Sequence, residues 1–227
     1  MRIKVISCLM CILLVITNFS LEFSKNANAD VIVTEEWVAR YDGPGIGPAN
    51  DWDRGEAIAI DSFGNIYVTG YSYGNGTRKD YVTIKYDSVG NELWVARYNG
   101  PRNRWEEALD ISIDSSGDIY VTGRSEGDYV TIKYNSDGNE IWVAKYNGPD
   151  NKVDDVYAMV LDSYGNVYVT GYSCCEGGGS DFATVAYNSS GTELWKARYD
   201  SPGNDYDKAN DIVTLTFISL LLYLFCK

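Results

Sequence analysis

The stretch GNIYVTG at residues 64–70 decides the fold, because close copies of it follow at residues 117–123 (GDIYVTG) and 165–171 (GNVYVTG). The copies begin 53 and then 48 residues apart. In each copy, aliphatic side chains alternate with aromatic and hydroxyl side chains, which is the period-two pattern of a β-strand. A tandem spacing of about 50 residues indicates a repeat architecture.

A second motif, which contains a tryptophan, recurs out of phase with the first. Its copies are EEWVARY (35–41), NELWVARY (91–98), NEIWVAKY (139–146) and TELWKARY (192–199). A single repeat cannot bury both of its faces, so we expect the tryptophans to pack between neighbouring repeats. They are Trp37, Trp94, Trp142 and Trp195.

Each full repeat contains four short segments with strand character. In the first repeat these are residues 56–61, 65–72, 80–87 and 92–98. The turns between segments, such as DSFGN and NSDGN, open with Asp or Asn and place Gly three residues later, which favours tight antiparallel hairpins. Four antiparallel strands per repeat are typical of a β-propeller blade.

We therefore expect an all-β fold, a β-propeller of four-stranded antiparallel blades. Three blades are complete, at about residues 56–98, 107–146 and 157–199. Single strands are expected to flank them, at Glu35–Tyr41 and from about Ala209 onward. Because propellers usually have four to eight blades, this inventory predicts an incomplete ring.

The chain also resembles a known repeat family. The run YDSVGNELWVARYNGP (86–101), together with GNIYVTG and DYVTIKY (80–86), is similar to the exported bacterial and archaeal beta-propeller repeat called SBBP. The resemblance covers about residues 35–213. It implies a propeller in an exported or surface protein. It implies no defined activity, because the family is defined by its repeat.

Residues 1–29 have the organisation of a signal peptide. A short basic start precedes an apolar run from Val5 to about Phe19, and a small-residue site, Ala27–Ala29, follows. We expect cleavage before Asp30 and an extracytoplasmic protein that is secreted, periplasmic or at the cell surface. The alternative is an N-terminal membrane anchor, although the run is shorter than the ~20 residues that a spanning helix needs.

The composition excludes several classes of function. The chain has no histidine, which rules out Ser-His-Asp and Cys-His nucleophilic sites and histidine-ligated metals. Its 32 acidic residues outnumber 19 basic ones, so nucleic acid is not an expected partner, because that binding depends on Lys and Arg. Cys174, Cys175 and Cys226 remain after signal cleavage, and their state stays open. An odd number of cysteines does not make a disulfide framework.

The tail after about Thr214 is unlike the repeats. Each connection between blades carries an Asn, an acid three residues later and an Asp eight residues beyond the acid, but Leu215 occupies the place of the next Asp. We favour an array interrupted by a frameshift or a premature stop; the alternative is that residues 214–227 are a hydrophobic anchor that contacts the membrane. The repeats then occupy residues 30–213, and the open blade edges are expected to favour self-association.

Equivalent connections place one acid each on one rim of the propeller. With nearby asparagines, these carboxylates could bind Ca²⁺, which prefers oxygen ligands. The alternative is that each acid bonds the backbone of its own connection. Repetition favours this alternative, because a framework needs the same residue in every blade. The acids are Asp53, Glu106, Asp154 and Asp207. No other cofactor is expected.

Trp52 and Trp105 take equivalent places in the first two connections. Their rings could stack on a sugar or a peptide, or they could fill the gap between blades. No catalytic group of residues stands out from the repeats, so we do not expect an enzyme. We expect an exported binding or scaffold module for a protein or glycan ligand at the cell surface, as a truncated copy of a longer array. The alternative is a carbohydrate-active enzyme, a glycosidase or a polysaccharide lyase, on a propeller scaffold.

Overall fold

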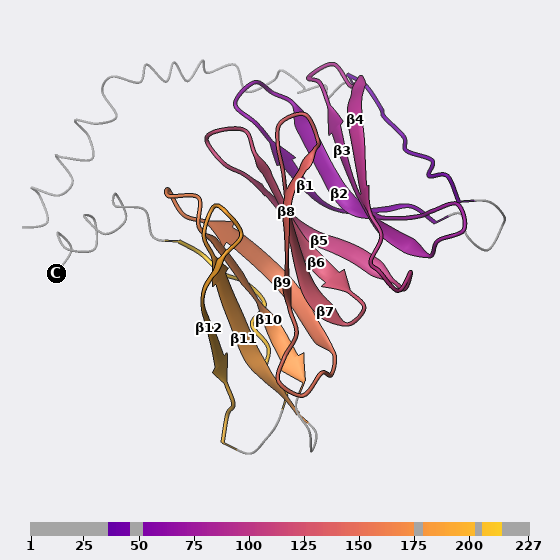
Figure 1. The fold of residues 1–227 in the computed structure, drawn as a ribbon. Coiled ribbons are helices and arrows are strands. Elements are labelled where there is room, and N and C mark those ends of the chain that lie inside the picture. The colour runs from indigo at the N-terminus through magenta and orange to yellow at the C-terminus, as the bar shows by residue number, and fades with distance from the viewer. Residues whose placement is uncertain (1–35, 46–51, 175–178, 203–205, 215–227) are drawn as a thin grey trace, which may run out of the picture. The chain divides into compact units, whose positions relative to one another are not determined.

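Three four-stranded antiparallel sheets make up the fold (Figure 1). The computed structural model describes residues 36–45, 52–174, 179–202 and 206–214, and these contain no helix. Each sheet is one propeller blade, in which the strand order follows the chain. The all-β architecture that the repeats predict is therefore confirmed, and the sheets of the described residues do not close into a ring.

The strand bounds show how regular the repeat is. Blade 1 comprises β1 (Arg54–Ile60), β2 (Ile66–Tyr73), β3 (Lys79–Tyr86) and β4 (Glu92–Tyr98). Blade 2 comprises β5 (Glu106–Ile113), β6 (Ile119–Ser125), β7 (Asp128–Tyr134) and β8 (Glu140–Tyr146). Blade 3 comprises β9 (Asp154–Leu161), β10 (Val167–Cys174), β11 (Ser180–Tyr187) and β12 (Glu193–Tyr199).

The repeated turn sequence closes each hairpin through its first residue. In the β1–β2 turn, Asp61 Oδ1 accepts hydrogen bonds from the backbone N–H groups of Phe63 and Asn65, both at 2.9 Å. Gly64 has φ +80°, a left-handed conformation that glycine adopts without strain. These two requirements explain why the turns keep their Asp or Asn and their Gly while the residue directly before the Gly varies.

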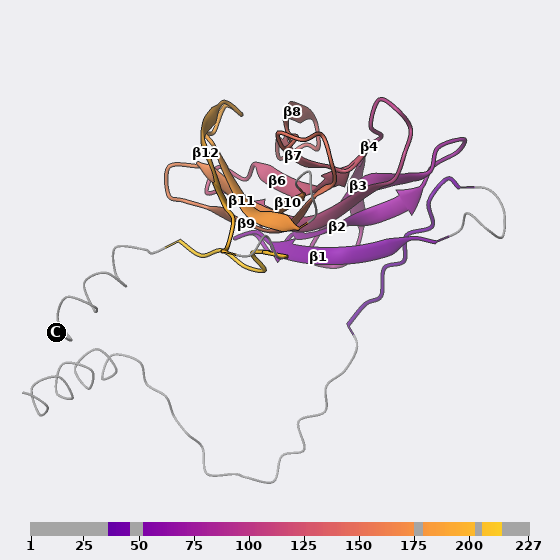
Figure 2. The same ribbon diagram turned by 90° about the horizontal axis from the view of Figure 1, so that it is seen from below.

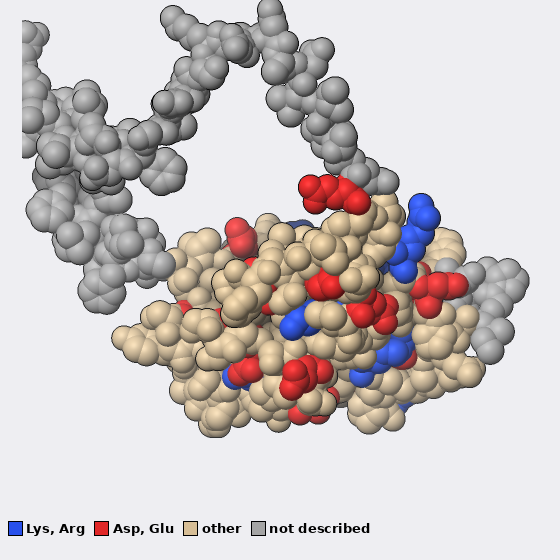
Figure 3. All heavy atoms as spheres, turned by 90° about the horizontal axis from the view of Figure 1, so that it is seen from above, with Lys and Arg blue, Asp and Glu red and all other residues tan. Residues whose placement is uncertain are grey.

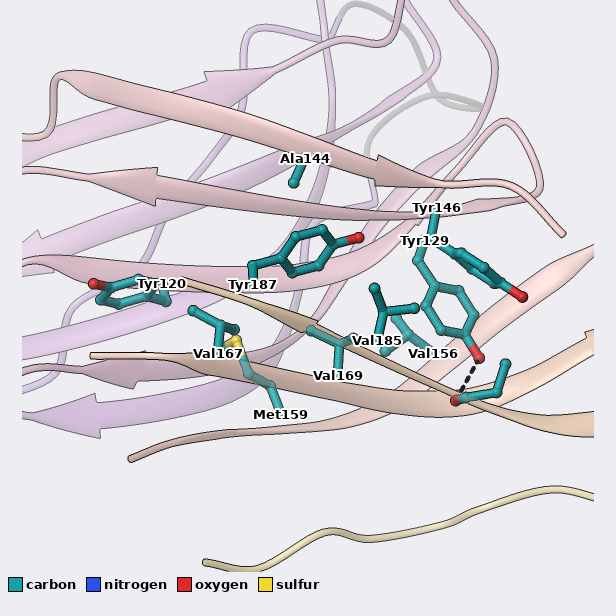
Figure 4. Close-up of a cluster of buried hydrophobic side chains, with 11 residues drawn as sticks. Tyr120, Tyr129, Ala144, Tyr146, Val156, Met159, Val167, Val169, Val185 and Tyr187 are labelled. Atoms are coloured by element: carbon teal, nitrogen blue, oxygen red, sulfur yellow. Dashed lines mark hydrogen bonds between the residues drawn. The ribbon is translucent and has the colours of Figure 1, made fainter. Parts of the chain in front are cut away.

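Figure 2 shows the blades from below, and neighbouring blades pack through two chemically different faces, whose side chains Figure 4 shows for blades 2 and 3. The first strands β1, β5 and β9 contact one another in turn. Between blades 2 and 3, aliphatic residues of blade 3 such as Val167 and Val169 pack against Tyr120 and Tyr129 of blade 2. The Tyr129 hydroxyl donates to the Tyr172 backbone oxygen at 3.0 Å. Each interface thus joins an aromatic face of one blade to an aliphatic face of the next.

The repeated tryptophans lie at the outer ends of these interfaces. Trp94 of blade 1 covers Gly138 of the β7–β8 turn, and its indole N–H donates to the Ser136 backbone oxygen at 3.1 Å. In the same way, Trp142 of blade 2 covers Gly191 of the β11–β12 turn in blade 3, and Trp37 covers Gly90 of the β3–β4 turn in blade 1. Trp195 stays 45% exposed on blade 3.

The flanking segments differ from the expected single strands. Residues 36–45 form no β-ladder, and residues 206–214 make one isolated parallel bridge, between Tyr206 and Ser180. A segment becomes a regular strand only when a neighbour offers a ladder of free backbone groups. The predicted signal peptide, the tail beyond Thr214, Cys175 and Cys226 lie outside the described residues. Within the described residues, no helix is long and apolar enough to cross a membrane.

The first strand of each blade begins earlier than the sequence pattern predicts. The expected starts are residues 56, 107 and 157, whereas β1, β5 and β9 begin at Arg54, Glu106 and Asp154. Each of these strands has a register shift against its partner, which adds a residue without ending the pairing. The strands β5 and β9 therefore begin at the repeated acids Glu106 and Asp154, and β1 begins directly after Asp53.

Candidate functional site at the loop rim

One end of the blades carries the connections between blades, and we call this end the loop rim. It comprises residues 42–45, 52–53, 74–78, 99–105, 126–127 and 147–153, with the strand ends beside them. Side chains hold these loops together: Asn103 accepts from the Arg78 N–H at 3.3 Å and donates to the Gly76 backbone oxygen at 3.2 Å. The Arg102 N–H donates to Glu126 at 2.6 Å. The rim is thus a structured surface.

Three of the four repeated acids bond the backbone of their own connection. Asp154 accepts from the Gly148 N–H at 2.6 Å, and the same bond joins Asp53 to Gly43 and Asp207 to Ser201, at 2.7 Å in both cases. The repeated asparagines have a backbone role as well, since Asn103 and Asn151 adopt φ of 51°, a left-handed conformation that asparagine tolerates.

Glu106, the fourth acid, is longer by one methylene and fully buried. Burial raises its pKa from 4.5 to about 7, and the negative charges of Asp80 and Glu126 add to this effect. Because Ca²⁺ takes six to eight oxygen ligands, a single carboxylate per blade does not make a site. In the part of the chain that the structure describes, no three acidic or cysteine side chains lie together to hold a metal. Calcium binding stays a prediction.

The two connection tryptophans are exposed. Trp52 is 71% exposed and Trp105 is 55% exposed. The Trp105 ring lies 5.6 Å from the Lys79 ammonium, which also sits 3.8 Å from the centroid of the Tyr71 ring. A cation held between two aromatic faces is a stable arrangement, and it fixes Lys79 at the rim. Sequence reasoning found Trp105 but missed Lys79 and Tyr71.

An ion-pair network continues from Lys79 across all three blades. Lys79 of blade 1 and Arg124 of blade 2 both pair with Glu107. Arg124 also reaches Asp155 of blade 3 at 3.2 Å. Burial would raise the pKa of Glu107, but the hydrogen bonds from Lys79 and Arg124 bring it below its usual value. Basic side chains also lie beside acidic ones on the molecular face in Figure 3.

This network occupies positions at which the repeats disagree. Glu107 corresponds to Arg54 in blade 1, and Arg124 corresponds to Tyr71 and Tyr172 in the other blades. Positions that serve blade packing keep the same residue type, whereas these vary in charge and shape. This variation is the sequence signal that could have found the network. A comparison of equivalent positions in the three blades would have picked out these rim residues as the ones that differ.

Cys174 also lies near the rim, at the end of β10. Burial raises the pKa of its thiol, and the charge of Asp154 acts in the same direction. A reactive cysteine needs the opposite shift, because the thiolate is the nucleophile. The described surroundings of Cys174 therefore do not activate it.

Comparison with known families agrees with the blade architecture. The SBBP family, a beta-propeller repeat, matches residues 46–76 and 141–173. The first matched segment runs from a connection through β1 and β2, and the second runs from β8 through the next connection into β9 and β10. These two segments of the chain therefore match the SBBP beta-propeller repeat. No curated protein matches the chain.

Proposed function

We propose that this propeller-repeat chain is an exported module that binds a protein or glycan ligand at the cell surface through the loop rim. One observation carries the proposal: residues that differ between blades, among them Tyr71, Lys79, Glu107 and Arg124, gather at the rim beside exposed Trp105. A framework needs equal residues in every blade, so unequal ones that assemble in one place point to a ligand. Tryptophan and arginine are also the residues that most often dominate binding surfaces.

A binding role fits these residues better than catalysis on sugars. A glycosidase needs one carboxylic acid that is protonated near neutral pH and a second, ionised carboxylate beside the substrate. Glu106 has the raised pKa, about 7, but is fully buried away from any substrate. Glu107 is ionised and held by Lys79 and Arg124. The carbohydrate-active enzyme stays the alternative proposal, tested by turnover of neutral and acidic polysaccharides.

The test is a binding screen of the secreted chain on glycan and protein arrays, followed by titration with the best ligand. The variant Trp105→Val copies Val153, the equivalent residue of blade 3, so the framework accepts it. We expect affinity to fall about tenfold, which corresponds to ~1.4 kcal/mol. Val89→Ala is the control and leaves affinity unchanged, because Val89 is an exposed residue of the β3–β4 turn, at the end of the blades opposite the loop rim. A ligand that binds both variants and the original chain equally would overturn the assignment to the rim.

A further inference from the structure

The end of the blades opposite the loop rim holds two cavities that share one turn. The first, of about 440 Å³, lies between the β1–β2 turn and the β5–β6 turn. The second, of about 730 Å³, lies between the β5–β6 turn and the β9–β10 turn. Both are lined by Asp114, Ser115 and Ser116 of the shared turn. We call the two cavities together the turn groove. Their sizes are those of small-ligand sites.

Exposed aromatic side chains stand at the outer walls of the turn groove. Phe63 lines the first cavity and is 85% exposed, and Tyr164 lines the second and is 82% exposed. Both occupy the variable position of the turn sequence, where the shared turn has Ser116. The turn geometry does not require an aromatic residue there, and neither ring gains stability from burial. Their place beside a cavity needs another explanation.

The middle of the groove offers hydroxyl groups. Asp61, Asp114 and Asp162 are occupied by their own turns, each accepting backbone hydrogen bonds. The hydroxyls of Ser115 and Ser116 are exposed and make no side-chain hydrogen bond within the described part of the chain. They are therefore available to a ligand.

Lysine ammonium groups line each cavity. Lys85 donates to the Ser136 backbone oxygen at 3.2 Å, and Lys133 pairs with Asp118 at 2.8 Å. Each also lies over a tyrosine ring, 5.1 Å from its centroid for Lys85 and 4.9 Å for Lys133. These lysines keep donor protons to spare. The second cavity holds more carboxylates than ammonium groups, so it repels a polyanion.

We propose that the turn groove binds a neutral oligosaccharide. Sugar rings stack on Phe63 and Tyr164, as apolar sugar faces do on aromatic rings, and sugar hydroxyls bond Ser115, Ser116 and Lys133. The two cavities follow one another along successive blade interfaces, which suits a linear chain of several sugars. This site is separate from the loop rim, so it stands whether or not the rim binds a ligand.

The experiment is a calorimetric titration of the full chain with three neutral tetrasaccharide probes: the β-1,4-linked oligomers of glucose, mannose and N-acetylglucosamine. Phe63→Ser and Tyr164→Ser both copy the residue of the shared turn and therefore keep the fold. We expect at least one probe to bind, and each variant to weaken it about fivefold to tenfold. Val89→Ser, at an exposed turn tip outside the groove, is the matched control and leaves affinity unchanged.

Three results would overturn the proposal. They are no binding of any neutral probe at millimolar concentration, binding that both groove variants leave intact, and tighter binding of an acidic tetra-uronate than of every neutral probe. Trp105→Val separates this proposal from the loop rim: loss of binding in that variant alone assigns the glycan to the rim and removes it from the groove.

Discussion

Trp142 of β8 covers Gly191 in the β11–β12 turn so closely that a Cβ added to Gly191 would lie 2.7 Å from the indole ring. Real Cβ atoms do not approach a ring to that distance, so blade 2 requires glycine at this position of blade 3. The same relationship joins Trp94 to Gly138. Glycine is needed here for the contact between blades as well as for the turn.

The first prediction separates the two reasons for glycine at this position, the left-handed turn conformation and the contact with the tryptophan. Gly191 and Gly117 share φ +82°, but a Cβ on Gly117 would meet nothing within 4 Å. Gly117→Ala should therefore cost only the backbone strain, about 1–2 kcal/mol. Gly191→Ala should cost more, by about 1–3 kcal/mol, because it also displaces Trp142. Urea unfolding followed by circular dichroism measures both, and equal losses would show that the tryptophan contact contributes nothing.

The second prediction concerns pH. The pKa of Glu106 is raised from 4.5 to about 7, so the folded chain holds this proton more tightly than the unfolded chain does. Stability must then fall as pH rises from about 4.5 to 7. Glu106→Gln, which cannot ionise, should match the original chain at pH 4 and exceed it at pH 8 by up to ~3 kcal/mol.

Glu107→Gln is the control for the pH experiment. The pKa of Glu107 is lowered, so its ionised form stabilises the folded chain above its usual pKa. This variant should lose stability at pH 8, opposite to Glu106→Gln. Denaturant unfolding at pH 4, 6 and 8 gives the comparison. A Glu106→Gln variant that is less stable than the original at pH 8 would contradict the buried, destabilising charge.

The third prediction tests the hydroxyl contacts between blades. Tyr81 donates to the Val130 backbone oxygen at 3.2 Å, and Tyr129 donates to the Tyr172 backbone oxygen at 3.0 Å. The equivalent residue in blade 3 is Phe182. Tyr129→Phe should reduce the free energy of unfolding by about 1–2 kcal/mol, because the part-buried Tyr172 carbonyl loses this donor. Tyr164→Phe, at an exposed turn tip, should change nothing measurable.

The fourth prediction distinguishes two possible roles of the repeated acids, which are hydrogen bonding to the backbone of their own connection and binding of Ca²⁺. Because Asp154 already bonds the Gly148 N–H, Asp154→Ala should destabilise the chain by about 1–2 kcal/mol with or without calcium. Thermal melts in 5 mM Ca²⁺ and in excess chelator should superimpose. A melting temperature that rises with Ca²⁺, and a rise that Asp154→Ala abolishes, would instead establish a metal site.

The features that could be predicted from the sequence are those that recur, because a pattern that appears in several repeats is easier to recognise than one that appears once. The turn aspartates, the glycines and the packing of Trp94 and Trp142 follow from counting one pattern several times. The network of Lys79, Glu107 and Arg124 was missed, since it joins blade 1 to blade 2 and none of its members has an identical residue at the equivalent position of another blade. A comparison that looks for features common to all repeats does not detect such residues. Only the structure shows that they lie close together and form one ion-pair network.

The flanking segments were misread for a different reason. Glu35–Tyr41 has the sequence of an outer strand, and Trp37 indeed covers Gly90 as Trp94 covers Gly138. What a sequence cannot show is whether a partner strand is present to complete the ladder. Phe63 and Tyr164 escaped notice because turn positions were interpreted only as chain reversals, although their side chains line cavities.

The unequal faces of the blades bear on how such a chain changes over generations. Blades 2 and 3 each meet the preceding blade with aliphatic residues, and blades 1 and 2 each meet the following blade with aromatic ones. A duplicated blade inserted between two existing blades therefore finds matching surfaces on both sides at once. Recombination between the similar repeats can therefore lengthen or shorten the protein by whole blades. The blades on either side of the change already carry the residues that form the interface.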